Sequence, residues 1–291
     1  MSELFRQPID ASTRYCAVFG HPVKHSASPA MQNAGIAALG LNWRYLAFDV
    51  DPKNLREALL GAKRMGFIGV NLTVPHKLLA MEIVDLLDAS AETFGAVNTI
   101  RFEDGDGGEI RSHGFNTDAG AITQSLREDL GMELRGAKVL LLGAGGAGRV
   151  AALKLATESV SERHLVNRTE SKAAAVAEEI RRRHPAVKVS VGSPRGTVDL
   201  LLNATSLGLK PDDASPLDEG KFSLGKAQAV YDMIYRPAET PLLKAAKAAG
   251  SRVANGIGML LHQGAKALEI WSGRPAPIAV MRRALEQNVY G

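Results

Sequence analysis

Lys77 is the first residue whose position suggests chemistry. It follows an apolar, strand-like segment over residues 67–74 and the pair Pro75 and His76, so we expect it in a proline-fixed turn after a buried strand. Partial removal of an amine from water favours the uncharged form, which can exchange a proton near neutral pH. Asp118, in the segment HGFNTD, is the predicted partner, because a nearby carboxylate would orient the ammonium group. The sequence therefore predicts a lysine–aspartate pair for proton transfer, with the histidine as the weaker candidate.

A glycine-rich turn is the second candidate site. Gly143, Gly145 and Gly148 form the pattern G-x-G-x-x-G between a strand pattern at residues 138–142 and a helical pattern. In such a turn the first glycine permits a tight bend, the second lets a pyrophosphate approach the backbone, and the helix N-terminus supplies amide donors. The pattern alone is common, but with a strand before it and a helix after it, it predicts a dinucleotide site.

The end of the next predicted strand indicates which dinucleotide binds. An NAD site usually has an aspartate or glutamate there for the ribose hydroxyls, whereas this chain has Asn167, Arg168 and Thr169, with Lys172 nearby. A carboxylate would repel the 2′-phosphate of NADP, and a guanidinium can bind it with charge-assisted hydrogen bonds. We therefore predict NADP as the cofactor.

These residues require a scaffold of alternating strands and helices. Strand-like runs are followed by helical patterns in the first third of the chain, which predicts a mostly parallel sheet, and the segments NTIRF and EIRSHGF predict one antiparallel pair. From about residue 137 to 258 the alternation continues as one doubly wound, Rossmann-type unit, and helical patterns at 258–273 and 276–288 end the chain. The predicted fold class is α/β with two domains.

Composition excludes several classes of protein. The 291 residues suggest about two domains, and 45% apolar with 23% charged residues is ordinary for a globular protein. One cysteine, Cys16, cannot form an internal disulfide, which fits the cytoplasm. The modest net charge of +4 argues against nucleic-acid binding, and the scattered histidines argue against a metal site. The N-terminus has no apolar segment, so we expect no signal peptide, and no apolar run is long enough to span a membrane.

Nine short segments occur in an order that resembles one known family. They are GHPVKHSASPAMQN (20–33), GVNLTVPHK (69–77), GAVNT (95–99), GFNTD (114–118), GAGGAG (143–148), NRT (167–169), NATSLG (203–208), YDMIY (231–235) and NGIGMLLHQGA (255–265). Together they resemble the shikimate dehydrogenase family over nearly the whole chain. The resemblance implies NADP-dependent reduction of 3-dehydroshikimate to shikimate, a step toward chorismate and the aromatic amino acids, with Lys77 and Asp118 as the catalytic pair.

The resemblance also implies roles for other residues. Those matching the substrate-binding positions are Ser26, Ser28, Thr73, Asn98, Tyr235 and Gln263. Those matching the cofactor-binding positions are Gly143, Gly145, Gly146, Ala147 and Gly148 near the pyrophosphate, Asn167, Arg168, Thr169 and Lys172 around the adenosine phosphate, and Thr205, Met233, Gly256 and Met259 near the nicotinamide ribose. The family's fold implies a substrate domain of residues 1–118 completed by the helices of 259–291, and a Rossmann NADP domain of residues 119–258.

Several alternatives stay open. Gln32 stands where many members of the family have histidine, and this resembles the quinate/shikimate dehydrogenases that use NAD or NADP, whereas Arg168 favours the NADP enzyme. Ser206 replaces a common proline, and we expect that change to be neutral. A non-catalytic NADP-binding regulator would be expected to lose Lys77 or Asp118, and methylene-tetrahydrofolate dehydrogenase has no role for the paired serines. The chain is expected to be a monomer or a homodimer.

Overall fold

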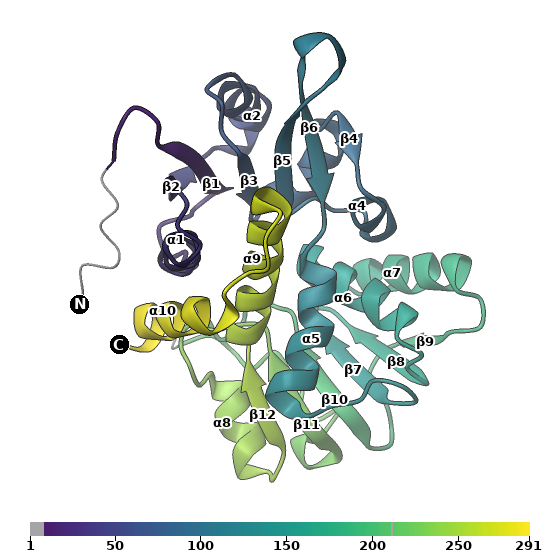
Figure 1. The fold of residues 1–291 in the computed structure, drawn as a ribbon. Coiled ribbons are helices and arrows are strands. Elements are labelled where there is room, and N and C mark those ends of the chain that lie inside the picture. Colours follow the sequence, from purple (N-terminus) through teal and green to yellow (C-terminus); the bar gives the residue numbers. More distant parts are fainter. Residues whose placement is uncertain (1–8, 211) are drawn as a thin grey trace. The chain divides into compact units, whose positions relative to one another are not determined.

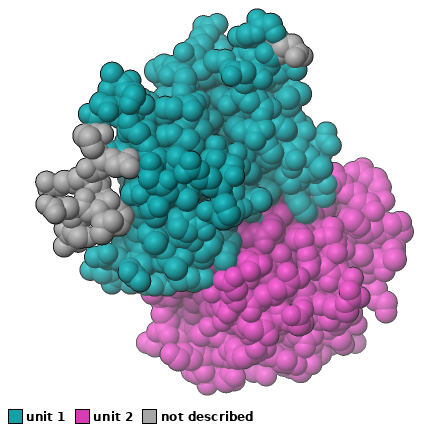
Figure 2. All heavy atoms as spheres, viewed as in Figure 1, with its two compact units in different colours: residues 1–118, 260–291 teal, residues 119–259 magenta. Residues whose placement is uncertain are grey.

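The structure is a computed structural model that describes residues 9–210 and 212–291. The first eight residues, which begin the segment used to predict the absence of a signal peptide, lie outside the described residues. The chain forms two compact units (Figure 2): unit 1 is Met1–Asp118 with Leu260–Gly291, and unit 2 is Ala119–Met259.

Unit 1 is built on a six-stranded sheet with the strand order β2-β1-β3-β5-β6-β4 (Figure 1). Its strands are β1 (Arg14–Gly20), β2 (Trp43–Asp49), β3 (Gly69–Leu72), β4 (Leu86–Leu87), β5 (Thr99–Asp104) and β6 (Ile110–Phe115). β1 is parallel to β2 and β3, whereas β5 is antiparallel to β3 and β6. The predicted parallel strands and the predicted antiparallel pair are both confirmed.

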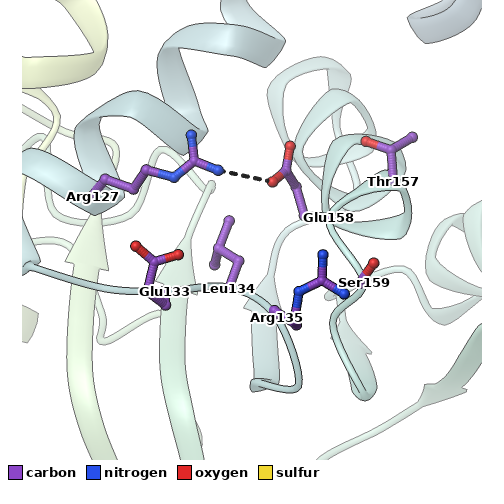
Figure 3. A pocket seen from close by; sticks show the side chains of 7 residues that line it. All are labelled: Arg127, Glu133, Leu134, Arg135, Thr157, Glu158 and Ser159. Atoms are coloured by element: carbon purple, nitrogen blue, oxygen red, sulfur yellow. Dashed lines mark hydrogen bonds and ion pairs between the residues drawn. The ribbon is translucent and has the colours of Figure 1, made fainter.

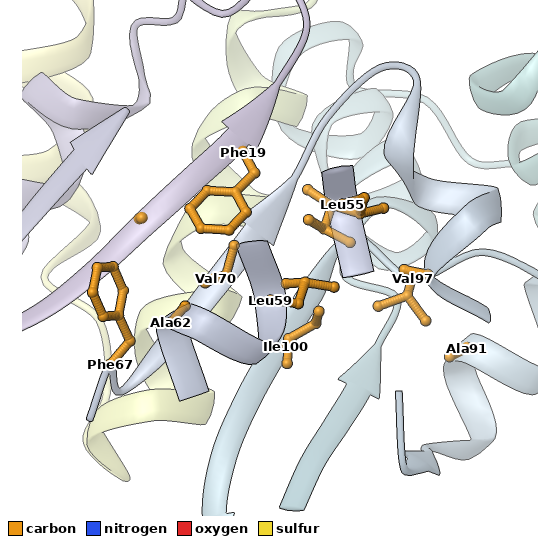
Figure 4. Packing of buried hydrophobic residues seen from close by; sticks show 12 residues of the cluster. Phe19, Leu55, Leu59, Ala62, Phe67, Val70, Ala91, Val97 and Ile100 are labelled. Atoms are coloured by element: carbon orange, nitrogen blue, oxygen red, sulfur yellow. The ribbon is translucent and has the colours of Figure 1, made fainter. Parts of the chain in front are cut away.

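The helices of unit 1 cover the sheet according to their apolar spacing. They are α1 (Ser28–Ala38), α2 (Leu55–Arg64), α3 (His76–Leu79), α4 (Ala89–Phe94), α10 (Ile278–Tyr290) and most of α9 (Ile257–Ser272). In α2 the buried residues Leu55, Leu59 and Ala62 lie on one stripe of the helix, and they pack in one hydrophobic cluster with Phe19 and Val70 of the sheet (Figure 4).

The sheet is approached closely by α9 at a glycine. A Cβ atom at Gly69 would lie only 2.2 Å from Nε1 of Trp271, and that indole nitrogen donates a 2.9 Å hydrogen bond to the carbonyl of Ile100. The absence of a side chain at Gly69 therefore makes room for the tryptophan against the strands. In this way the last helices of the chain complete the core of unit 1.

Unit 2 is a doubly wound domain whose six strands are all parallel, in the order β12-β11-β10-β7-β8-β9. The strands are β7 (Lys138–Leu142), β8 (Glu162–Val166), β9 (Lys188–Val191), β10 (Val198–Asn203), β11 (Ala227–Asp232) and β12 (Arg252–Asn255). The helices are α5 (Asp118–Leu130), α6 (Gly146–Thr157), α7 (Glu170–Arg183) and α8 (Pro241–Ala248). This order reverses direction between β7 and β10, as in Rossmann domains, so the predicted fold class is confirmed.

Two details differ from the sequence prediction. The strand expected over residues 67–74 is shorter, because β3 is Gly69–Leu72, and Lys77 lies in the four-residue helix α3 and not in the proline-fixed turn itself. That expectation was wrong, because the amide of His76 bonds to the carbonyl of Thr73 and the chain coils directly after Pro75. None of the described helices is long and apolar enough to span a membrane.

Candidate active site

Lys77 and Asp118 form an ion pair in unit 1. The distance between Nζ of Lys77 and Oδ2 of Asp118 is 2.6 Å. The lysine side chain is 24% exposed and the aspartate side chain only 5%, so the carboxylate is buried while the amine still reaches solvent. α3 presents the lysine after β3, and the aspartate is the first residue of α5. The structure therefore brings the two predicted proton-transfer residues into direct contact.

Asn98 holds the second oxygen of the same carboxylate. Its Nδ2 donates to Oδ1 of Asp118 at 2.8 Å, and its Oδ1 accepts a 2.7 Å hydrogen bond from the backbone amide of Thr117. That backbone donor sets the orientation of the amide group, so the nitrogen must face the carboxylate. Both oxygens of Asp118 therefore accept hydrogen bonds. The carboxylate is fixed by Asn98, and it fixes the ammonium group of Lys77 in turn.

His76 is not placed for acid–base chemistry. It is fully buried, and desolvation lowers the pKa of its imidazole. A neutral, buried ring beside Lys77 fits a structural role. The preference for the lysine over the histidine agrees with this geometry.

The other predicted substrate residues of unit 1 lie next to α1, after β3 and on α9. Ser26 precedes α1, and its Oγ accepts from the backbone amide of Ser28 at 3.4 Å. Thr73 follows β3, and its amide donates to the carbonyl of Phe19. Gln263 lies on α9, where its Nε2 bonds to the carbonyl of Leu260. Tyr235, the remaining predicted substrate residue, belongs to unit 2.

Gln32, the departure from the common family pattern, has a packing role. It is fully buried on α1, and its Nε2 donates to the carbonyl of Gly264 on α9 at 2.8 Å. A Cβ atom at Gly264 would lie 2.2 Å from the Met31 side chain, so the two helices approach closely there. Gln32 thus anchors the turn of α9 next to Gln263.

The predicted dinucleotide turn has the geometry that its glycines suggested. Gly143 has a φ of 102°, which favours glycine, and its amide bonds to the carbonyl of Val166 at 2.8 Å. A Cβ atom at Gly148 would lie 2.2 Å from the carbonyl oxygen of Gly143, so only glycine lets α6 start this close to the turn. At Gly145 and Gly146, by contrast, a Cβ atom would meet no protein atom within 4 Å, which leaves the backbone open to a ligand.

Asn167 connects that turn to the segment predicted to hold the adenosine phosphate. Its Oδ1 accepts from the amide of Ala144 at 3.0 Å, and its Nδ2 donates to the carbonyl of Thr169 at 2.8 Å. Arg168 and Lys172 are exposed, and neither forms an ion pair with a carboxylate in the described part of the chain. Two cations without a counterion beside a dinucleotide turn are suited to a phosphate group.

The residues predicted for the nicotinamide end also lie next to one another within unit 2. The hydroxyl of Thr205 donates to Oδ1 of Asn203 at 2.8 Å, and the amide of Met233 donates to the carbonyl of that asparagine at 2.9 Å. A Cβ atom at Gly256 would lie 2.0 Å from the carbonyl oxygen of Met233, so these loops are in contact. Met259 lies in the first turn of α9.

Sequence reasoning missed the buried polar residues behind the candidate site. Asp232, fully buried, accepts from Asn203 at 3.0 Å and from Thr240 at 2.7 Å, and so joins the loops after β10 and β11. In unit 1, Asn71 and Thr99 are buried in the strands next to Asn98. The one available signal is a polar residue within an otherwise apolar strand pattern, and local periodicity does not show what such a residue contacts.

A separate pocket in unit 2 is not part of this site. It lies before β7 and at the end of α6 (Figure 3), and its lining residues are Arg127, Glu133, Leu134, Arg135, Thr157, Glu158 and Ser159. Arg127 and Glu158 form an ion pair at 3.3 Å across it. The glycine turn follows the carboxyl end of β7, whereas this pocket precedes its amino end.

Three family models match successive parts of the chain. They are the shikimate dehydrogenase substrate binding domain at residues 18–100, shikimate/quinate 5-dehydrogenase at residues 125–204, and the shikimate 5′-dehydrogenase C-terminal domain at residues 256–286. The matches follow the order of the segments that suggested the resemblance.

Named relatives match the chain over almost its whole length. The NADP-dependent shikimate dehydrogenase of Methanopyrus kandleri is 41% identical over 97% of this chain and 98% of its own. A crystal structure of a shikimate dehydrogenase with NADP⁺ has a TM-score of 0.88 at 39% identity and covers 98% of both chains. The shikimate 5-dehydrogenase of Thermus thermophilus with NADP(H) and shikimate has a TM-score of 0.83 at 37% identity and covers 94% of this chain and 99% of its own. With this identity over nearly its full length, the chain belongs to the shikimate dehydrogenase family.

Proposed function

We propose that this protein is an NADP-dependent shikimate dehydrogenase, which reversibly reduces 3-dehydroshikimate to shikimate. The observation that carries the proposal is the 2.6 Å pair of Lys77 and Asp118, held by Asn98. A non-catalytic member of the family would have no need of a buried carboxylate that is hydrogen-bonded through both oxygens and paired with a lysine that reaches solvent. The pair therefore favours the enzyme over a binding protein.

The residues of unit 2 fit NADP. The open backbone at Gly145 and Gly146 accommodates a pyrophosphate at the N-terminus of α6, and the free cations Arg168 and Lys172 suit a 2′-phosphate. When bound, the nicotinamide supplies the hydride that reduces the carbonyl carbon. Thr205, which follows β10 and donates to Asn203, is assigned to the nicotinamide end of the site.

The residues of unit 1 supply the proton and the orientation. Lys77 donates a proton to the carbonyl oxygen as the alcohol forms, and accepts it in the reverse reaction. Asp118 keeps the ammonium group of Lys77 at a fixed position, so less conformational entropy of the lysine side chain is lost when the substrate binds. We assign Ser26 and Ser28 to the substrate carboxylate, and Thr73, Asn98, Tyr235 and Gln263 to its ring hydroxyls. Unit 1 is then the substrate domain and unit 2 the NADP domain. A monomeric or homodimeric state and a cytoplasmic location stay predictions.

The glycine turn gives a paired prediction. Gly145→Ala should weaken NADPH binding about tenfold, because its methyl group would occupy the space assigned to the pyrophosphate. Its cost in free energy of unfolding should stay below about 1 kcal/mol, the usual loss for alanine at a helix N-cap. Gly148→Ala should instead lower that free energy by about 1–3 kcal/mol, because its methyl group meets the Gly143 carbonyl. NADPH fluorescence titration and urea unfolding measure the two effects, and unchanged NADPH binding in Gly145→Ala would contradict the assigned position.

Initial rates with shikimate and quinate, each with NADP⁺ and NAD⁺, test the proposed function directly. We expect shikimate with NADP⁺ to have the highest kcat/KM, because Arg168 and Lys172 favour the extra phosphate. The second candidate is a quinate/shikimate dehydrogenase, for which the buried Gln32 in place of histidine is the motivating residue. Quinate turnover with NAD⁺ above shikimate turnover with NADP⁺ would favour that second candidate over ours.

A further inference from the structure

A line of buried polar side chains crosses the sheet of unit 1 and ends at the catalytic carboxylate. The phenol of Tyr45 on β2 donates to Oδ1 of Asn71 on β3 at 2.7 Å, and Nδ2 of that asparagine donates to Oγ1 of Thr99 on β5 at 3.0 Å. Thr99 donates to Oδ1 of Asn98 at 3.3 Å, and Asn98 donates to Asp118 at 2.8 Å. We call Tyr45, Asn71, Thr99 and Asn98 the polar relay.

The two side-chain amides of the polar relay have fixed orientations. The side-chain amide of Asn71 cannot be flipped, because its Nδ2 also lies 3.3 Å from the backbone carbonyl of Asn98, and a carbonyl can only accept a hydrogen bond. The side-chain amide of Asn98 cannot be flipped either, because the backbone N–H of Thr117 donates to its Oδ1. Hydrogen bonds aligned head to tail polarise one another, so this arrangement strengthens the final bond to the carboxylate.

The polar relay is buried where apolar side chains would be easier to accommodate. Tyr45 is 1% exposed, Asn71 5% and Thr99 0%, and burial raises the pKa of the Tyr45 phenol well above its usual value, so the group remains a donor. The opposite face of the same sheet is a purely apolar cluster around Phe19, Val70 and α2 (Figure 4). Buried polar groups carry a desolvation cost, which points to a task beyond packing.

The first member of the polar relay is tied to the segment assigned to the substrate carboxylate. Burial raises the pKa of the Tyr45 phenol, and the neighbouring Ser28 hydroxyl acts against that rise. Asn33, on the helix that begins at Ser28, also fixes the backbone of Tyr45, at 2.9 Å to its amide and 2.8 Å to its carbonyl. Motion of α1, which begins at Ser28, therefore reaches Tyr45 through Asn33.

We propose that Tyr45, Asn71 and Thr99 are positioning residues that couple Ser28, at the carboxylate subsite, to the Lys77–Asp118 pair. When the substrate's carboxylate accepts a hydrogen bond from Ser28, the position of Tyr45 changes. The hydrogen bonds of the polar relay transmit that shift to Asn98 and so to Asp118. The inference rests on the proposed function for its chemistry, whereas the geometry of the polar relay is independent of it.

Removal of single hydroxyl groups tests the polar relay. Tyr45→Phe and Thr99→Val should each lower kcat for shikimate oxidation about 5- to 30-fold, the effect of one weakened hydrogen bond, and Thr99→Val should leave the dissociation constant of shikimate within about twofold. Thr99→Ser retains the hydroxyl and should restore most of kcat. The control is Thr13→Val, since Thr13 is a buried threonine of unit 1 that bonds to Asn42 at 3.0 Å outside the polar relay. Loss of kcat no greater than in that control would overturn the proposal.

A double-mutant cycle tests the coupling itself. In the Ser28→Ala background Thr99→Val should cost less than in the wild type, with a coupling of about threefold or more in kcat. In the Ser26→Ala background Thr99→Val should cost its full factor. Ser26 serves the same assigned carboxylate, but among the described residues its hydroxyl hydrogen-bonds to the Ser28 amide and not to Tyr45. Multiplicative effects in both backgrounds would show that Ser28 and Thr99 act separately.

A readout without turnover separates this proposal from the proposed function. Acylation of lysines by acetic anhydride, followed by mass spectrometry, should become about threefold faster at Lys77 in Thr99→Val, because a loosened Asp118 releases the amine more often. Lys63, paired with Asp85 at 3.0 Å, is the internal control and should not change. A wild type without shikimate turnover would refute the function alone, and unchanged Lys77 acylation would refute the polar relay alone.

Discussion

Replacement of Lys77 by alanine is expected to lower kcat for shikimate oxidation by about 10²- to 10⁴-fold, the usual contribution of a positioned general acid–base. The dissociation constant of shikimate should change only a few-fold, because the serines and amides assigned to the substrate are untouched. The physical reason is that Lys77 is the solvent-reaching member of a pair whose carboxylate is buried and fully hydrogen-bonded. Stopped-flow or steady-state rates, with binding measured by calorimetry, separate the two quantities.

Lys63→Ala is the matched control for that experiment. Lys63 is also a lysine of unit 1 in an ion pair, with Asp85 at 3.0 Å, but it lies on α2 and outside the candidate site. Its loss should leave kcat within about twofold of the wild type, because Lys63 touches no residue of the candidate site and a surface ion pair contributes little to the free energy of unfolding. Turnover of Lys77→Ala above about 10% of the wild type would be too fast for a variant that lacks its general acid–base.

Replacement of Arg168 by aspartate should reverse the preference between the two cofactors. The kcat/KM for NADP⁺ should fall about 10²- to 10³-fold, because a charge-assisted hydrogen bond is lost and the new carboxylate repels the 2′-phosphate. The kcat/KM for NAD⁺ should stay the same or rise, because the carboxylate can accept hydrogen bonds from the ribose hydroxyls. Steady-state kinetics with both cofactors at saturating shikimate measure the change.

Arg182→Asp is the matched control for the cofactor prediction. Arg182 lies on α7, the helix that follows Arg168, is exposed, and undergoes the same change of charge far along that helix. It should alter neither cofactor preference by more than about twofold, because salt screens exposed charges that are separated by more than about 8–10 Å. If Arg168→Asp lowered kcat/KM for NADP⁺ and NAD⁺ by the same factor, its effect would be structural and the assigned phosphate contact would be wrong.

Most of the fold could be predicted because local patterns determine it. The alternation of apolar runs and helical spacing located most strands of both sheets, though not β12, and the glycine pattern at residues 143–148 located the start of α6. The pattern missed β4, which has only two residues, because so short a strand shows no period. It also placed Lys77 in a turn, since no apolar spacing distinguishes the four-residue helix α3 from an irregular segment.

The candidate site was predictable to a different degree in the two units. In unit 2 the glycine turn and Arg168 could be proposed as a cofactor site from their neighbours in sequence. The residues assigned to the nicotinamide end rested on the family resemblance. In unit 1 the substrate residues come from distant segments, and their roles rested on the family resemblance. Asn71 and Thr99 were not foreseen, because each is a single polar residue within a strand and its partner lies on another strand.

The sequence by itself determined the kinds of group available: a lysine after a strand, a carboxylate before a helix, a glycine turn and an arginine in place of an acidic residue. Only the tertiary structure decided that Lys77 and Asp118, 41 residues apart, lie at 2.6 Å, and that the donors of the polar relay point toward the carboxylate. The physical reason is the short range of the interactions that build the site. Hydrogen bonds and ion pairs act over about 3 Å, so they depend on the pairing and register of β3, β5 and β6, which no local pattern specifies.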